Sequence, residues 1–388
     1  MLLGMRTTPA TRLLGLGTTI FSEMSALAVA TGSINLGQGF PDEDGPPEVS
    51  EAAIAAIRNG ENQYPPGPGI ESLRRAIAGH QQRFWGIPVD PDREVLVTAG
   101  ATEAIAAAVL GLCDPGDEIL VFEPTYDSYT AVAAMAGAVL RPVTLEWPDL
   151  EADLDRLAAL VTPKTRLLLL NTPHNPTGKV FTSDELAGIA RLCVEHDLIA
   201  VTDEVYEHLV FEGVHQPLAT FPGMAERTLT ISSAGKTFSF TGWKIGWVCG
   251  PEALVTAVRT AKQFLTYVNG APFQPAVAVG LGLGDDFYRD LADTLRAKRD
   301  LLCDGLAKAG FGVEPPQGTY FATADIRPLG VDDGLAFCRS LPERCGVVAI
   351  PSAVFYADPA PGRHLVRFAF CKKVDVLEKA VARLATLA

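Results

Sequence analysis

The chain has 388 residues, of which 48% are hydrophobic and 20% charged, and its formal net charge is −14. This length suffices for two domains with their own cores, and the negative charge argues against a nucleic acid or an anionic membrane as a partner. The seven cysteines are scattered without a Cys-x-x-Cys pair, and the histidines do not cluster, which argues against a disulfide framework or a metal site. The first residues lack the pattern of a signal peptide, so we expect a cytoplasmic protein.

The N-terminal part predicts two helices and a stiff loop. Spaced apolar residues predict an amphipathic helix over Thr18–Ala30. The dozen residues at the start of the chain are expected to form a mobile tail, and extra length from an upstream start codon, at Met1 instead of Met5, is the alternative. A second helix is expected over Pro47–Arg58, followed by the loop Asn62–Gly69, whose three prolines and two glycines exclude regular structure. The pair Gly37 and Gly39 lacks the third glycine of a dinucleotide site, so no nucleotide is expected there.

Short apolar runs alternate with helical stretches in the middle of the chain. The runs cover residues 95–98, 119–122, 139–145, 166–170, 198–202, 228–231 and 245–249. The alternation predicts an α/β fold with a mostly parallel seven-stranded sheet, and ligands bind at the carboxyl ends of the strands in such sheets. Gly100 begins an alanine-rich helix, so the N–H groups near Ala101 and Thr102 predict an anion site. A helix cap by Thr102 is the alternative reading, and both can hold.

The pattern changes from Pro272 onward and predicts a smaller α+β domain. Helices are expected over residues 286–309, 333–340 and 374–387, and strands over 319–324, 347–350 and 365–370. We therefore expect three parts: an N-terminal segment, residues 1–45, that packs with the small domain, a large domain over residues 46–272, and the small domain over residues 273–388.

Charged residues stand at the ends of apolar strand-like runs. Lys236 follows the run Thr228–Ile231 among small residues, where burial lowers an ammonium pKa and supplies the neutral amine that a Schiff base requires. Asp203 follows a run of apolar residues, where a carboxylate requires a cation. Arg367 lies in an apolar strand and requires an anion such as a carboxylate. A surface loop for the lysine and a helix cap for the aspartate are the alternatives.

Four segments together resemble the class I/II aminotransferases, which are fold-type I enzymes that use pyridoxal 5'-phosphate (PLP). They are Asn171–Gly178, Thr202–Tyr206, Ser232–Trp247 and the strand that carries Arg367. The resemblance extends from Asn35 to the end of the chain. It implies transamination between an L-amino acid and a 2-oxo acid, with PLP as the cofactor.

The resemblance also implies a role for each matching residue. Lys236 is expected to bind the cofactor and transfer the proton, and Asp203 to pair with the pyridine nitrogen. Arg367, Gly39 and Asn175 are expected to bind the substrate. The further cofactor contacts that it implies are Asn175 and Tyr206 on the phenolate oxygen, Tyr126 on the ring, and Ala101, Thr102, Ser233, Lys244 and Tyr64 around the phosphate. Lys244 stands where many relatives have arginine.

Tyr64 carries an implication about assembly. In the family, the matching tyrosine crosses the dimer interface and bonds the phosphate in the partner's site. We therefore expect a homodimer with shared active sites, although packing in its own chain is the alternative for this residue.

Two branches of the family are similar to this chain. Residues 35–42 and 233–239 resemble the kynurenine, glutamine and methionine aminotransferases, whereas residues 64–69, 100–111 and 269–275 resemble the N-succinyldiaminopimelate aminotransferases of lysine biosynthesis. We expect the second activity, with N-succinyl-LL-diaminopimelate and glutamate as the substrate pair. A cysteine-S-conjugate β-lyase and a non-enzymatic PLP-binding regulator are the alternatives. The sequence indicates no cation for the distal carboxylates apart from Arg12.

Overall fold

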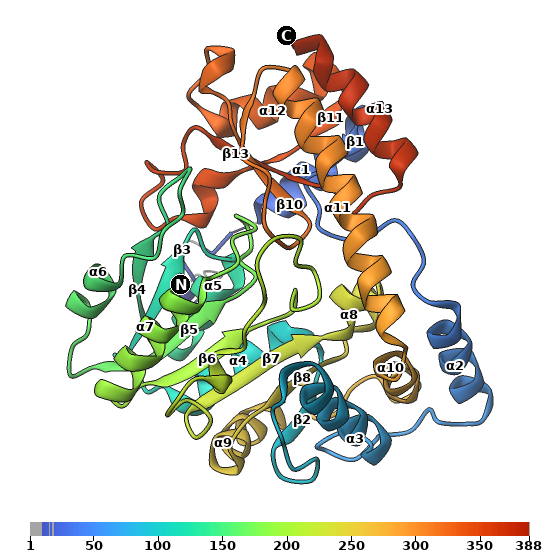
Figure 1. Cartoon of the computed structure of the whole chain (residues 1–388), viewed down its shortest axis with the longest axis vertical. Helices are drawn as coiled ribbons and strands as arrows, with labels where there is room; N and C mark the ends of the chain where they lie inside the picture. Colours follow the sequence, from blue (N-terminus) through green and yellow to red (C-terminus); the bar gives the residue numbers. More distant parts are fainter. Residues whose placement is uncertain (1–9, 15, 18, 388) are drawn as a thin grey trace, which may run out of the picture.

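The computed structural model of the protein describes residues 10–14, 16–17 and 19–387. Figure 1 shows a large unit, built on one wide sheet, below a small unit made of C-terminal elements and the first helix. The small unit comprises α1, β1 and the elements from α11 to the end of the chain. The long helix α11 (Asp285–Lys308) runs from the large unit up into the small one.

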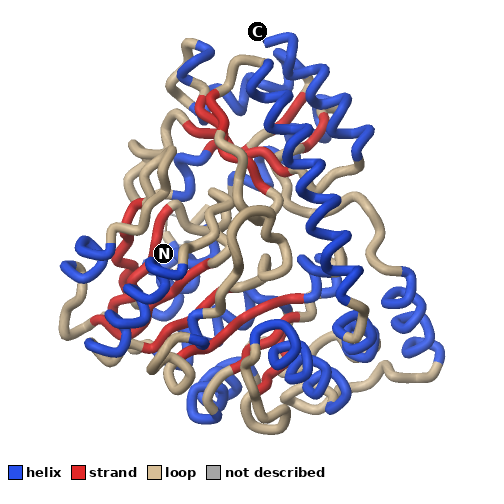
Figure 2. The backbone as a smooth tube through the Cα atoms, viewed as in Figure 1, coloured by secondary structure: helices blue, strands red, loops and turns tan. Residues whose placement is uncertain are grey.

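The large unit contains a seven-stranded sheet with the strand order β2-β8-β7-β6-β5-β3-β4. Its strands are β2 (Val95–Thr98), β3 (Glu118–Glu123), β4 (Val139–Thr144), β5 (Thr165–Asn171), β6 (Ile199–Asp203), β7 (Thr228–Ser233) and β8 (Gly246–Cys249). Only β8 runs antiparallel to its neighbours β2 and β7, and the other neighbouring pairs are parallel. The predicted seven-stranded, mostly parallel sheet is therefore confirmed, and its strands appear as red segments in Figure 2.

Alternate residues of the strands bury opposite faces of this sheet. Leu167 and Leu169 of β5 pack against α4, α5 and α9, whereas Leu168 and Leu170 pack against α6 and α7. A strand that is apolar on both faces is typical of a parallel sheet covered by helices on both sides. These helices are α4 (Gly100–Leu112), α5 (Asp127–Ala136), α6 (Leu154–Ala159), α7 (Ser183–Glu195) and α9 (Glu252–Lys262).

Helices at the β2 edge complete the large unit. They are α2 (Pro47–Arg58), α3 (Glu71–His80), α8 (Ala234–Thr237) and α10 (Phe273–Leu281), with a π-helical turn over Gln81–Trp85. The helix α2 has the expected bounds, and α4 begins at Gly100 as expected. The helix α3 was not expected from the sequence.

The small unit joins the two ends of the chain. Strand β1 (Ile34–Asn35) pairs in parallel with β11 (Val347–Val348), and the helix α1 (Ile20–Thr31) contacts α12 (Gly334–Cys345). A four-stranded sheet with the order β12-β13-β10-β9 lies beside them. The remaining elements are β9 (Gly312–Val313), β10 (Phe321–Asp325), β12 (Ile350–Pro351), β13 (Leu365–Ala369) and α13 (Val374–Leu384).

The expectation of one strand over residues 347–350 was wrong. The chain changes sheets at Ala349, so that β11 pairs with β1 while β12 pairs with β13. Burial explains the error, because all four residues from Val347 to Ile350 are fully buried and give one continuous apolar run. Such a run does not reveal which strand is the partner.

The N-terminus differs in part from the expectation. The helix α1 begins at Ile20, and the side chain of Thr19 caps it by accepting a hydrogen bond from the amide of Ser22. Residues 1–9 of the expected tail and Thr18 of the expected helix lie outside the described residues. Thr11 and Arg12, which also belong to the expected tail, are part of a 3₁₀ turn, Thr11–Leu13, that contacts α5.

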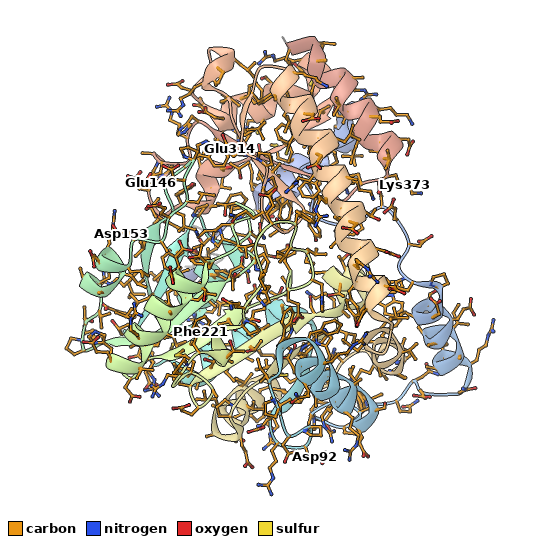
Figure 3. The ribbon with its side chains drawn as sticks, viewed as in Figure 1. Asp92, Glu146, Asp153, Phe221, Glu314 and Lys373 are labelled. Atoms are coloured by element: carbon orange, nitrogen blue, oxygen red, sulfur yellow. The ribbon has the colours of Figure 1, made fainter. Side chains whose placement is uncertain are left out.

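Charged side chains of both signs lie on the outside of the molecule. Asp92, Asp153 and Lys373 lie at its periphery in Figure 3, and all three are exposed. Within residues 10–14, 16–17 and 19–387, no helix is long and apolar enough to cross a membrane.

Candidate active site

A cavity of about 390 Å³ lies between the large unit and the small unit. It is lined by all but one of the residues that the sequence suggested for the site: Gly39, Ala101, Thr102, Tyr126, Asn175, Asp203, Tyr206, Ser233, Lys236, Lys244 and Arg367. The exception is Tyr64. The cavity therefore gathers side chains that are more than 300 residues apart in the sequence.

The sheet topology explains why these residues meet. Asn171, Asp203 and Ser233 are the last residues of the parallel neighbours β5, β6 and β7. Carboxyl ends of parallel strands lie at one edge of the sheet, which is the edge where α/β proteins bind ligands. Lys236 follows three residues later in the short helix α8, so that its side chain reaches the same edge.

Lys236 has a lowered pKa, which gives it access to the neutral amine form near neutral pH. Burial lowers the pKa of its ammonium group to about 8, although Cys371 and Asp203 act in the opposite direction. Its Nζ donates a hydrogen bond of 2.8 Å to the hydroxyl of Tyr320 and lies 3.4 Å from the carbonyl oxygen of Gly39. A lysine with this pKa is available near neutral pH both as a nucleophile and as a proton acceptor.

Asp203 is a buried carboxylate whose charge has no ion-pair partner among the described residues. Its Oδ2 accepts a hydrogen bond of 2.7 Å from the hydroxyl of Tyr129. Burial nevertheless raises the pKa of Asp203 to about 6. A cationic ligand beside it would favour the ionised form and lower that pKa.

The raised pKa of Asp203 predicts a pH-dependent effect on stability. Because the folded chain binds this proton more tightly than the unfolded chain, ionisation of Asp203 costs the cofactor-free wild type stability as the pH rises from about 4 to 6. Asp203→Asn removes that cost. The unfolding free energy of the variant relative to wild type should therefore increase by about 3 kcal/mol between pH 4 and pH 7.

Urea unfolding of both cofactor-free chains at several pH values measures this difference. Asp184→Asn, at an exposed aspartate outside the cavity, serves as the control for the general effect of an Asp-to-Asn change. A pH-independent difference for Asp203→Asn would contradict the assigned pKa.

Arg367 is a buried guanidinium that forms no ion pair with any described carboxylate. Its Nη1 donates to Oδ1 of Asn175 and its Nη2 to the carbonyl oxygen of Gly37, both at 3.0 Å. Its Nε is buried and has no hydrogen-bond partner among the described residues. Burial lowers the pKa of Arg367 to about 10, so the group stays charged at neutral pH and attracts an anion into the cavity.

The N-terminus of α4 offers donors to a second anion in the cavity. The helix α4 begins there at Gly100, with Ala101 and Thr102 in its first turn, and the positive end of the helix dipole favours an anion. Gly100 has a φ of +75°, and a Cβ at this position would lie 3.3 Å from Nζ of Lys244. Glycine thus allows the ammonium of Lys244 to approach the helix N-terminus.

Two predicted tyrosines line the cavity. Tyr126 contacts Tyr129 edge to face with ring centroids 5.8 Å apart, and burial raises the pKa of Tyr126 to about 12. The ring of Tyr206 lies 5.7 Å from Nζ of Lys236, and burial raises the pKa of this phenol as well. Both phenols therefore keep their protons at neutral pH and can donate hydrogen bonds to a ligand.

Tyr64 lies outside the cavity of its own chain, and 82% of its surface is exposed. It contacts Tyr267 edge to face with ring centroids 5.6 Å apart, and Phe264 on the same turn is 83% exposed. The structure of one chain therefore does not bring Tyr64 to the site, and its role across an interface stays a prediction.

Sequence reasoning missed Tyr129 and Tyr320. Tyr129 lies three residues after Tyr126 and holds Asp203, whereas Tyr320 comes from the small unit and holds Lys236. A helical spacing of three residues could have indicated Tyr129. Nothing in the local sequence could have indicated Tyr320, because its contact with Lys236 depends on how the two units meet.

Residues 31–384 match the family described as aminotransferase class I and II. The chain belongs to the class I and II aminotransferases. It is 57% identical to a probable N-succinyldiaminopimelate aminotransferase of Mycobacterium tuberculosis, over 97% of this chain and 98% of the relative. It is 40% identical to the methionine aminotransferase of Escherichia coli, over 98% of each chain.

Solved structures agree with the family assignment. The structure of N-succinyldiaminopimelate aminotransferase from Mycobacterium tuberculosis superposes with a TM-score of 0.96 at 56% identity, covering 98% of this aminotransferase and 100% of that chain. An aspartate aminotransferase from Thermus thermophilus reaches a TM-score of 0.91 at 32% identity, covering 99% and 100%. This protein is therefore a PLP-dependent enzyme that transfers amino groups, as the resemblance implied, and not a non-enzymatic regulator.

Proposed function

We propose that this aminotransferase transfers the amino group of glutamate to N-succinyl-2-amino-6-oxopimelate, which gives N-succinyl-LL-diaminopimelate and 2-oxoglutarate, and that it catalyses the reverse reaction as well. The observation that carries this proposal is the 57% identity, over nearly the whole chain, to the mycobacterial relative that carries this name. The second candidate is a methionine or kynurenine aminotransferase. The relatives with those names support it less, because their identities are 40% and 36–38%.

We propose that the cavity holds PLP, because its residues fit the cofactor. Lys236 would hold it covalently, Asp203 would pair with its ring nitrogen, and Tyr206 and Asn175 would donate to its phenolate oxygen. Tyr126 would cover the ring. The phosphate would lie among Ala101, Thr102, Ser233 and Lys244. Bound PLP supplies an electron-withdrawing ring and a carbon that carries the amino group between substrates.

The protein's own residues then perform two tasks in the proposed reaction. Arg367 binds the α-carboxylate of the substrate with a two-pronged hydrogen bond, assisted by Asn175 and by the backbone near Gly39. Lys236, released as a neutral amine, takes the proton from the Cα of the amino donor on its Nζ. In the second half of the reaction, Nζ gives a proton to the Cα of the 2-oxo acid that accepts the amino group. The carboxylate of Asp203 would stabilise the positive charge on the ring nitrogen of the cofactor during both halves of the reaction.

The distal end of the proposed substrate carries further carboxylates. Among the described residues, the cations that line the cavity are Lys236, Lys244 and Arg367, and each already has a role. Arg12 is exposed and does not line the cavity. We therefore infer that neutral donors, or residues of a second chain, bind the distal carboxylates.

We also propose a homodimer in which Tyr64 of one protomer completes the site of its partner. The exposed aromatic side chains of Tyr64, Phe264 and Tyr267 support this, because such a group on one face is typical of an interface. The cytoplasmic location and the three-part domain division at residues 45/46 and 272/273 stay predictions.

Hybrid dimers test the shared site. Tyr64→Phe and Lys236→Ala homodimers should both be impaired, whereas a hybrid holds one intact site with Lys236 from the first protomer and Tyr64 from the second. We expect the hybrid to regain wild-type activity per Lys236 site. Hybrids, verified by differently tagged protomers, that stay at the level of Tyr64→Phe would argue against sharing.

A substrate panel tests the proposed specificity. We expect the purified holoenzyme to turn over glutamate with N-succinyl-2-amino-6-oxopimelate at least 100 times more efficiently, as kcat/KM, than methionine, kynurenine or glutamine with an oxo acid, since a buried polar site discriminates by about this factor or more. Efficient turnover of methionine or kynurenine, with none of the acylated compound, would overturn the substrate and leave the family intact. Pyruvate and ammonia formed from a cysteine conjugate without an oxo acid would reveal a β-lyase.

A further inference from the structure

A chain of hydrogen bonds joins three distant parts of the protein at the cavity. Nζ of Lys236, in the large unit, donates to the hydroxyl oxygen of Tyr320 at 2.8 Å. The hydroxyl of Tyr320, in the small unit, donates to the carbonyl oxygen of Gly39 at 2.6 Å. Gly39 belongs to the N-terminal segment. The free amine therefore has a partner only where all three parts meet.

The proton of Tyr320 has a defined place in this chain. Burial raises the pKa of this phenol well above its ordinary value, so it stays protonated. A phenol has one proton, and the short contact to the Gly39 carbonyl uses it, because a carbonyl can only accept. The oxygen of Tyr320 is therefore left as an acceptor for an N–H of Lys236, and the lone pair of the neutral amine must be directed elsewhere.

Packing fixes both partners of the amine. The ring of Tyr320 is 1% exposed and contacts Tyr206 and Phe321 edge to face, with centroid distances of 5.3 and 4.9 Å. A Cβ on Gly39 would lie 2.4 Å from Cζ of Phe321, so only glycine brings its carbonyl this close. The acceptor oxygen therefore has little freedom to move.

Tyr320 contacts the amine without lining the cavity. Tyr206 differs in this respect, since it lines the cavity and faces the space for a ligand, and among the described residues it forms no hydrogen bond with Lys236. The geometry thus separates Tyr206, which faces the space for a ligand, from Tyr320, which contacts Lys236 but does not line that space.

We propose that Tyr320 is the positioning residue of Lys236: it accepts a hydrogen bond from the freed amine and thereby directs the lone pair of Nζ at the substrate Cα. The proposal rests on the proposed function, in which Lys236 transfers that proton. It also links the amine to the N-terminal segment, because the bond to Gly39 orients the hydroxyl of Tyr320.

The loss of the hydroxyl should alter the titration of Lys236. Among the titratable groups around it, Cys371 and Asp203 raise its pKa, whereas Arg367 and Lys244 lower it, and Tyr320→Phe leaves all four in place. An ammonium donates a stronger hydrogen bond to Tyr320 than a neutral amine does. Without that acceptor, we expect the pKa of Lys236 to fall by about half a unit to one unit.

Trace acetylation measures this shift in the full-length, cofactor-free chain. The protein is treated with a small amount of acetic anhydride from pH 6 to pH 10, and mass spectrometry gives the labelling of Lys236 relative to the exposed Lys164. We expect a midpoint near pH 8 for wild type and a lower one for Tyr320→Phe. Tyr356→Phe, at a buried tyrosine of the same core outside the cavity, is the control and should keep the wild-type midpoint.

Steady-state kinetics of the holoenzyme provide the second readout. We expect Tyr320→Phe to lower kcat about tenfold, with KM for the amino donor changed less than threefold, because an amine that is poorly aimed slows proton transfer but not binding. An unchanged midpoint in Tyr320→Phe, or a loss of kcat equal to that of Tyr356→Phe, would overturn the proposal.

Two provisions keep the test decisive. If Tyr320→Phe fails to fold, site-specific fluorotyrosine at position 320 keeps the hydroxyl but weakens its oxygen as an acceptor, and must still lower the midpoint. The labelling requires no substrate, and the kinetics can use whichever amino donor the wild type accepts. A failure of the N-succinyl assignment is thus distinguishable from a failure of the role of Tyr320.

Discussion

Lys236→Ala should lower the rate of transamination by about 10⁴-fold or more, because one side chain supplies both the covalent attachment and the proton transfer. Burial gives Lys236 a pKa near 8, whereas an exposed lysine titrates at about 10.4. Lys244 also lines the cavity, but it is exposed and lies beside Gly100, so we do not expect it to take over. Single-turnover kinetics with an amino donor measure the loss.

Lys236→Arg separates charge from basicity. Arginine keeps the positive charge but has no neutral form at neutral pH, so this variant should be as inactive as Lys236→Ala. Both variants should retain the wild-type circular dichroism spectrum, because the residue faces a cavity. Activity in Lys236→Arg within tenfold of wild type would show that the charge alone, and not the amine, is required.

Arg367→Lys should lower kcat/KM about 100-fold for every amino acid that the enzyme accepts, which corresponds to about 2.7 kcal/mol. The α-carboxylate is common to all substrates, and lysine keeps the charge without the planar fork that binds both of its oxygens. The buried Nε without a partner indicates that the guanidinium has a donor reserved for a ligand. Kinetics with at least three amino acids test whether the loss is uniform.

Arg299→Lys is the matched control for this prediction. Arg299 is also buried, but it pairs with Glu212 and Asp300 and does not line the cavity. We expect Arg299→Lys to change kcat/KM less than threefold. If Arg367→Lys reduced kcat/KM for one amino acid only, the residue would bind a particular side chain and not the carboxylate.

Most of what the sequence could predict about the site came from residues at the ends of strands. Asp203 and Lys236 follow apolar runs directly, so the local pattern places them at the carboxyl edge of a parallel sheet without knowledge of any distant contact. Arg367 was identified by an analogous conflict, a charged side chain in an apolar strand. Each of these signals lies within a few residues of the side chain that it concerns.

Contacts between the units could not be predicted in this way. The bonds from Lys236 to Tyr320 and from Tyr320 to Gly39 span 84 and 281 residues. The division of residues 347–350 between two sheets likewise depends on β1, which lies more than 300 residues earlier. Such pairings are decided by tertiary packing and not by propensity or period.

Reduction of the holoenzyme with borohydride tests the central claim most directly. Borohydride converts the link between PLP and a lysine into a stable bond, and mass spectrometry of the peptides then identifies the modified residue. We predict one modified site per chain, at Lys236 in the peptide between Ser232 and Trp247. A stable label on Lys244, Lys262 or Lys372, or no label in a protein that transaminates, would contradict the assignment of Lys236 and of the cavity around it.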